Sequence, residues 1–164
     1  MQVNLVVDIG NSSVKIGIFD QEKLMEVIRQ DKFDYSDIEQ LTTRYSLSNL
    51  VVCSVRNRDI PERDSLSRQF GHYLELTSQT PLPIENHYKT PETLGKDRIA
   101  AVVGGRALYP KRNLLIIDAG TAITFDFLDK KGRYLGGNIS PGMTIRYNAL
   151  HQDTHGLPDR KSVV

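Results

Sequence analysis

Two short segments of the sequence place a carboxylate, a glycine and small polar residues between apolar runs. The first is VVDIGNSSVKIGIFD, which contains Asp8, Gly10 and Lys15, and the second is IIDAGTAITFDFLD, which contains Asp118 and Gly120. A loop of this composition can turn backbone N–H groups toward an anion, because glycine permits close approach and a positive φ. Hydroxyl and amide side chains add donors, and Lys15 can neutralise phosphate charge. The pattern predicts a phosphate-binding hairpin in each segment.

The aspartates of these segments predict a metal ion. Carboxylates repel phosphate unless a cation lies between them, so Asp8 and Asp118, brought together across a cleft, are expected to bind a metal that bridges phosphates. Two lobes would then clamp a nucleotide without the usual glycine-rich loops, since neither GxxxxGKS/T nor GxGxxG occurs in the chain. The alternative is that each Asp-x-Gly unit is an ordinary hairpin turn.

A third group of residues, TPETLGKDR at positions 90–98, places the carboxylate of Asp97 next to the guanidinium of Arg98. Asp97 could accept a proton from a substrate hydroxyl. Arg98 could bind a substrate carboxylate through two parallel hydrogen bonds. The alternative is a helix N-terminus with a favourable aspartate and a solvated arginine.

The elements that must position these residues follow from the apolar pattern. Ser36 and Glu39 have capping-box spacing before Ile38 and Leu41, which predicts a helix, and Pro61–Phe70 predicts another. Strands are predicted at Val3–Asp8, Val14–Phe19, Lys23–Arg29, Leu50–Val55 and Tyr73–Leu76. The predicted order is therefore strand, strand, strand, helix, strand, helix, strand (βββαβαβ).

The pattern restarts after a connector at 81–91, which has three prolines and is expected to run over the surface. Arg98–Tyr109 predicts a helix whose Gly104 and Gly105 would let another helix approach closely. Further elements are predicted in the order strand, strand, strand, helix: Asn113–Asp118, Ile123–Leu128, Arg133–Leu135 and a helix from Met143. Gly136-Gly137 and Pro141-Gly142 are expected to bracket a loop. The repetition indicates a duplicated lobe, with divisions at 1–80, 81–110 and 111–164.

The overall composition narrows the class of protein. The 164 residues include 21 Lys and Arg against 20 Asp and Glu, a net charge of +1 that argues against nucleic-acid binding. The single cysteine, Cys53, excludes an internal disulfide and favours a reducing compartment. There is no signal-peptide pattern and no apolar run near the roughly 20 residues that span a bilayer. These features predict a soluble cytoplasmic protein that binds neither membrane nor nucleic acid.

Together, the motifs resemble those of the type III pantothenate kinases, in the acetate and sugar kinase/Hsc70/actin superfamily. Segment 8–15, DIGNSSVK, is similar to the family's DxGNTxxK, with Ser12 in place of threonine. Segment 90–98 resembles TPxxLGxDR, DAGTAIT at 118–124 resembles DxGTAxT, and GGNISPG at 136–142 resembles GGxIxPG. The four motifs occur in family order, and the resemblance covers residues 1 to about 158.

The resemblance implies an α/β fold of two actin-like (ribonuclease H-like) lobes, the second incomplete because the chain is C-terminally truncated. It implies phosphorylation of pantothenate to 4′-phosphopantothenate by ATP with Mg²⁺, the first step of coenzyme A biosynthesis. Asp97 is the expected general base, and Asp118 the expected ligand of a K⁺ or NH₄⁺ ion. The expected ATP contacts are Asp8, Ile9, Gly10, Asn11, Ser12, Ser13, Val14, Lys15 and Thr121. The expected substrate contacts are Tyr88, Gly95, Lys96, Asp97 and Arg98. A homodimer is also implied.

Two other functions stay open at this stage. One is another small-molecule kinase of the same superfamily, and the other is a non-catalytic actin-like paralogue that serves as a transcriptional accessory factor. Lys15, Asp97 and Arg98 favour a kinase, because a regulator needs no group to orient a substrate hydroxyl. An incomplete second lobe also predicts an exposed apolar sheet edge with a tendency to associate.

Three remaining features are expected to have no special role. His151 and His155 are four residues apart but lack the glutamate of a HExxH zinc site. Cys53 lies in an apolar strand and is expected in the core. The arginines at 56, 58, 63 and 68 alternate with acidic residues, which predicts a solvated surface.

Overall fold

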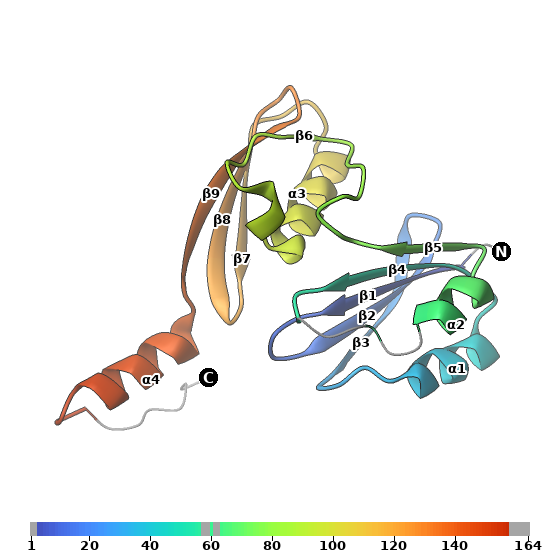
Figure 1. Cartoon of the computed structure of the whole chain (residues 1–164), viewed down its shortest axis with the longest axis horizontal. Coiled ribbons are helices and arrows are strands. Elements are labelled where there is room, and N and C mark those ends of the chain that lie inside the picture. Colours follow the sequence, from blue (N-terminus) through green and yellow to red (C-terminus); the bar gives the residue numbers. More distant parts are fainter. Residues whose placement is uncertain (1–2, 57–59, 61–62, 158–164) are drawn as a thin grey trace. The chain divides into compact units, whose positions relative to one another are not determined.

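The computed structural model describes residues 3–56, 60 and 63–157. The chain divides into two compact units. The first consists of Met1–Thr80 with Gly95–Asp97, and the second of Pro81–Leu94 with Arg98–Val164. Each unit is built on its own β-sheet (Figure 1).

The first unit holds a five-stranded sheet in the order β3-β2-β1-β4-β5. Strands β1, β2 and β3 are antiparallel neighbours, whereas β4 runs parallel to β1 and β5 parallel to β4. The elements are β1 (Val3–Ile9), β2 (Val14–Asp20), β3 (Lys23–Gln30), α1 (Tyr35–Arg44), β4 (Leu47–Ser54), α2 (Arg63–Gln69) and β5 (His72–Glu75). The predicted βββαβαβ order is confirmed.

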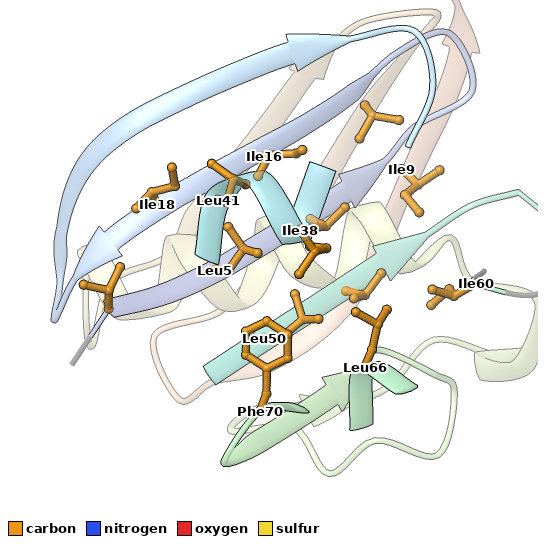
Figure 2. Close-up of a cluster of buried hydrophobic side chains, with 14 residues drawn as sticks. Leu5, Ile9, Ile16, Ile18, Ile38, Leu41, Leu50, Ile60, Leu66 and Phe70 are labelled. Atoms are coloured by element: carbon orange, nitrogen blue, oxygen red, sulfur yellow. The ribbon is translucent and has the colours of Figure 1, made fainter. Parts of the chain in front are cut away.

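The core of this unit lies between the sheet and its two helices. Alternate residues of β1 are buried, as expected of a strand with one face on a core. Figure 2 shows Ile38 and Leu41 of α1 and Leu66 of α2 among the buried side chains of the strands. Ile38 and Leu66 are fully buried, so both helices are held mainly by their apolar faces.

The second unit holds a four-stranded sheet in the order β6-β9-β8-β7. Strands β7, β8 and β9 are antiparallel neighbours and are followed by a helix, which repeats the opening of the first unit. The elements are β6 (Glu85–Asn86), a short 3-10 helix (Pro91–Thr93), α3 (Lys96–Leu108, in this unit from Arg98), β7 (Leu114–Ala119), β8 (Ala122–Leu128), β9 (Arg133–Pro141) and α4 (Met143–Asp153). The predicted restart of the pattern is confirmed.

Helix α1 begins earlier than the predicted capping box. Its cap is Asp34, whose carboxylate accepts a hydrogen bond from the Ser36 N–H at 3.3 Å. Asp37 completes the box by accepting from the Asp34 N–H at 2.8 Å. Ser36 and Glu39 have the right spacing, but Asp34 and Asp37 have it too, and their stronger acceptors form the cap.

The connector at 81–91 contains a short strand, whereas the sequence predicts only a connector over the surface. Glu85 and Asn86 form β6, which pairs in parallel with Arg133 and Tyr134 of β9. The Glu85 N–H also donates to the Gly132 carbonyl at 2.9 Å. Two residues are too few for any periodicity, so this strand leaves no signal in the sequence.

Strand β9 is longer than predicted, because it passes through Gly136 and Gly137 and ends at Pro141. Gly137 lies opposite Asp126, and a Cβ atom there would lie 1.7 Å from the Phe125 carbonyl oxygen. The glycine therefore permits close strand contact rather than a loop. Gly105 also permits close approach, with a virtual Cβ 3.2 Å from Ile116, but its neighbour is strand β7 and not a helix.

No described helix is long and apolar enough to cross a membrane. The predicted helix start at Pro61 lies outside the described residues, and α2 begins at Arg63.

Candidate functional site

The first hairpin places a carboxylate and an ammonium group side by side. Asp8, near the end of β1, is the cross-strand partner of Lys15 on β2. The Lys15 Nζ lies 3.6 Å from Asp8 Oδ2, and the two side chains are 50% and 37% exposed. Both groups can therefore contact a ligand at the hairpin tip.

The glycine of this hairpin acts differently from the prediction. The Gly10 N–H donates to the Ser13 carbonyl at 3.0 Å, so it closes the turn and does not face outward. Gly10 does not have a positive φ. A Cβ atom would lie 3.1 Å from the Ser13 oxygen, a tight contact that favours glycine for steric reasons. Backbone donors for an anion must come from Asn11, Ser12 and Ser13.

Arg56 lies against the same turn, although the sequence predicts a solvated surface residue. Its Nε donates to the Gly10 carbonyl at 2.8 Å, and its Nη2 lies 3.4 Å from the Asn11 carbonyl. Nη2 also lies 3.5 Å from the Asp31 carbonyl. The prediction is wrong for Arg56, whereas Arg63 and Arg68 are exposed and Arg58 lies outside the described residues.

The position of Arg56 in the order of strands predicts its place beside the turn. It comes just after β4, and β4 runs parallel to β1 with Asp8 opposite Cys53. The ends of parallel neighbours meet at one sheet edge, where α/β folds bind ligands. A charged residue directly after β4 therefore belongs beside the residues that follow β1.

Asp8 and Asp97 both act on the buried thiol of Cys53 in the first unit. Burial first, and then the negative charges of Asp8 and Asp97, raise the pKa of Cys53 to about 12. Lys96 opposes them. The predicted burial of Cys53 is confirmed. The first turn of α3 therefore brings the carboxylate of Asp97 into the electrostatic surroundings of Asp8.

Arg98 is buried in the second unit, at 8% exposure, and is held by Asp126. Its Nη2 donates to Asp126 Oδ1 at 2.6 Å, and its Nε donates to the same oxygen at 3.0 Å. Burial lowers the pKa of Arg98, but the hydrogen bond and charge of Asp126 outweigh it and keep the guanidinium charged. A solvated arginine, the alternative considered from the sequence, is excluded.

Two tyrosines complete this cluster. The Tyr134 hydroxyl donates to Asp126 Oδ1 at 2.6 Å, and burial together with that bond raises the pKa of Tyr134. The Tyr88 ring stacks on Tyr134 with centroids 6.2 Å apart, and the Arg98 Cζ lies 5.7 Å from the Tyr88 centroid. The structure thus brings together the predicted substrate residues Tyr88 and Arg98.

Asp126 and Tyr134 are not among the site residues predicted from the sequence. Strand β8 buries Thr124, Asp126 and Leu128 on one face. A carboxylate in the buried register of a strand needs a partner, because an unpaired buried charge is strongly unfavourable. That register was the available signal, and it points to a cation nearby.

The second hairpin has exposed tip residues. Asp118 is paired with Thr124 across the ladder, and both Asp118 and Thr121 are exposed. The Gly120 N–H donates to the Ala122 carbonyl at 2.9 Å, and the Gly142 N–H donates to the Thr121 carbonyl at 3.0 Å. The described residues contain no group of three His, Cys, Asp or Glu side chains able to hold a metal.

Comparison with known proteins identifies the family. The profile of type III pantothenate kinases matches residues 4–163. The chain belongs to the type III pantothenate kinase family. Type III pantothenate kinases of Phocaeicola vulgatus and Bacteroides fragilis are 46% and 42% identical to it over 156 residues. The alignments cover 95% of this chain but only 64% of each of these kinases.

Solved structures give a looser likeness. The ethanolamine utilization protein EutJ from Carboxydothermus hydrogenoformans aligns with 92% of this chain and 56% of its own, at 13% identity and a TM-score of 0.48.

Proposed function

We propose that the protein transfers the γ-phosphoryl group of ATP to the primary hydroxyl of pantothenate, giving 4′-phosphopantothenate and ADP. The observation that carries this proposal is the family match over residues 4–163, which spans all four motifs. The placement of Gly95–Asp97 in the first unit supports it, because it puts the proposed base, Asp97, in the same unit as the phosphate motif.

In the proposed reaction the pantothenate hydroxyl oxygen attacks the γ-phosphorus. The new P–O bond forms as the bond to the β–γ bridging oxygen breaks, and ADP leaves with that electron pair. The hydroxyl proton passes to the carboxylate of Asp97. Since phosphoryl transfer has a loose transition state, the proton moves late and Asp97 acts mainly by orienting the hydroxyl.

The first hairpin is the proposed phosphate site, with backbone donors from residues 11–13, further contacts from Ile9, Gly10 and Val14, and a positive charge from Lys15. Asp8 fits a magnesium ion, since Mg²⁺ usually takes one or two carboxylates together with phosphate oxygens and water. The partly exposed Asp8 oxygens supply such a ligand without a larger protein cluster. Bound Mg²⁺ would neutralise charge on the phosphates.

The remaining proposed ligands belong to the second unit, except Gly95 and Lys96, which belong to the first. Thr121 is the proposed further ATP contact, and the exposed carboxylate of Asp118 the proposed ligand of K⁺ or NH₄⁺. Arg98 is proposed to bind the pantothenate carboxylate, with Tyr88, Gly95 and Lys96 as further contacts. Asp126 supports this role by fixing the guanidinium through Nε and Nη2.

We also propose that the kinase acts as a homodimer in the cytoplasm. The single cysteine, which is buried and forms no disulfide, supports a reducing compartment. Nothing in the comparisons supports a transcriptional accessory factor.

A coupled assay of ADP release tests the proposal. ATP, Mg²⁺ and pantothenate are supplied with either potassium or sodium chloride at equal ionic strength. We expect pantothenate-dependent ADP release that is faster with potassium. ATP binding without transfer to pantothenate or any pantetheine precursor would contradict the kinase and favour the regulator.

A further inference from the structure

The guanidinium of Arg56 is bound to the backbone of the phosphate hairpin itself. Its bonds to the Gly10 and Asn11 carbonyls, at 2.8 and 3.4 Å, join β4 to the turn between β1 and β2. The adjacent Val55 N–H donates to the Ile9 carbonyl at 3.1 Å. The segment after β4 therefore contacts three successive carbonyls of the turn, all from within the first unit.

These bonds determine which way the turn directs its N–H groups. In a planar trans peptide, the carbonyl of one residue and the N–H of the next point in opposite directions, and the structure has no cis peptide among its described residues. Because Arg56 holds the Gly10 carbonyl, the Asn11 N–H points away from the guanidinium. The donor is thereby set on the side of the hairpin opposite Arg56.

An arginine suits this task better than a lysine. Its planar fork can bind two carbonyls at once and stays charged at any physiological pH. The charge also stabilises the aligned carbonyls, which would otherwise repel an approaching phosphate.

In the second unit, a backbone N–H group and not a side chain binds a carbonyl of the hairpin turn. There the Gly142 N–H donates to the Thr121 carbonyl at 3.0 Å at the corresponding hairpin tip. A side chain at 142 would be impossible, because a Cβ would lie 2.3 Å from the Gly120 oxygen. Both hairpins are therefore tied by their carbonyls from outside the turn, which argues against a chance contact at Arg56.

We propose that Arg56 is a positioning residue for the ATP phosphates, which it serves by holding the Gly10 and Asn11 carbonyls so that the Asn11 N–H faces the phosphate side. This inference rests on the proposed function, since it needs the hairpin to bind ATP. Arg56 itself lies behind the turn and touches no reacting atom.

The test compares Arg56→Met and Arg56→Lys with Arg68→Met, a matched control on α2 whose arginine is exposed and bonds only within its own helix in the described contacts. Binding of a non-hydrolysable ATP analogue with Mg²⁺ and of AMP is measured by calorimetry. We expect Arg56→Met to weaken binding of the ATP analogue by about tenfold, which corresponds to the free energy of one charged hydrogen bond. AMP, which lacks the β- and γ-phosphates, should change by less than about twofold. Arg68→Met should match the wild type for both ligands.

Amide hydrogen exchange in the nucleotide-free protein supplies a second readout. Amides at 11–13 should exchange faster in Arg56→Met, and Arg56→Lys should restore them only in part because it lacks the fork. Unchanged exchange, equal loss of ATP and AMP binding, or full rescue by lysine would overturn the inference. If the wild type fails to bind ATP, the proposed function falls and this role falls with it. If the wild type binds the ATP analogue and Arg56→Met binds it equally well, the role of Arg56 is overturned and the proposed function is not.

Discussion

At the scale of single residues, the burial of charge decides what each group can do. Arg98 and Asp126 are both buried, and each is the partner that balances the other's charge. Replacing one partner leaves the other charged and unpaired, whereas an exposed pair such as Lys15 and Asp8 tolerates the same change.

Asp126→Asn should lower the free energy of unfolding by about 3–5 kcal/mol, because it leaves Arg98 buried without a counter-charge. If Asp126 also orients Arg98 toward pantothenate, the KM for pantothenate should rise more than the KM for ATP. Urea unfolding and steady-state kinetics measure the two effects. The matched control is Tyr134→Phe, which removes one hydrogen bond to Asp126 and should cost only about 1 kcal/mol. Equal stability of wild type and Asp126→Asn would contradict the role of the pair.

Cys53 should be unreactive in the folded protein. Its pKa is raised from 9.0 to about 12, first by burial, so the folded state keeps a proton that the unfolded state loses in this interval. The thiol's contribution to stability is therefore complete below pH 9 and is lost as the pH rises toward 12. A disulfide reagent at pH 8 should label Cys53 only after urea is added.

The comparison with Cys53→Ala isolates the pH effect. Over the same alkaline interval the variant should lose stability less steeply than the wild type, because it lacks the titrating thiol. Rapid labelling of the native thiol at pH 8, or parallel alkaline slopes, would show that the burial argument is mistaken.

At the scale of elements, the alternation of apolar residues predicts most of the strands of the first unit. The strands β1, β2 and β4 are visible in the sequence because one side of each faces the core. Asp8 and Lys15 were predictable as partners for the same reason, since a short hairpin sets its own register.

The features that escaped prediction depend on tertiary contact. Strand β6 exists only because β9 lies beside it, and the cap of α1 was decided between two pairs with equal spacing. Arg56 looks like a surface residue in sequence because it begins a polar stretch in which acidic residues alternate with arginines. Its role appears only when β4 is placed next to β1.

Two glycines of the second unit, Gly104 and Gly137, should respond oppositely to replacement by alanine. Gly104→Ala should stabilise α3 by about 0.5–1 kcal/mol, since nothing lies within 4 Å of the new Cβ. Gly137→Ala should destabilise by at least about 2 kcal/mol, because its Cβ would meet the Phe125 carbonyl oxygen and force β8 and β9 apart. Urea denaturation of both variants measures the difference. Equal effects of the two substitutions would contradict the described packing of β9.

At the scale of the whole molecule, the described chain presents an apolar edge. Strand β7 is an outer strand of its sheet, and Leu115 and Ile117 are 62% and 56% exposed. The exposed apolar edge predicted from the sequence is present among the described residues. Exposed edges of this kind pair with other chains.

We therefore expect concentration-dependent association of the chain in light scattering after size exclusion. The double variant Leu115→Lys/Ile117→Lys should reduce it, because two charges oppose edge pairing. Leu24→Lys, at a comparably exposed apolar position on β3, is the control and should not abolish association. A wild type that stays monomeric at high concentration would refute this expectation.

The central claim is that Asp97 orients the pantothenate hydroxyl for phosphoryl transfer from ATP. The measurement that tests it most directly follows 4′-phosphopantothenate by mass spectrometry in wild type and Asp97→Asn, with ATP affinity determined in parallel. We expect product from the wild type, at least about a hundredfold slower turnover in the variant, and nearly equal ATP affinities. Turnover of Asp97→Asn within a few-fold of the wild type, or no product from the wild type, would contradict it.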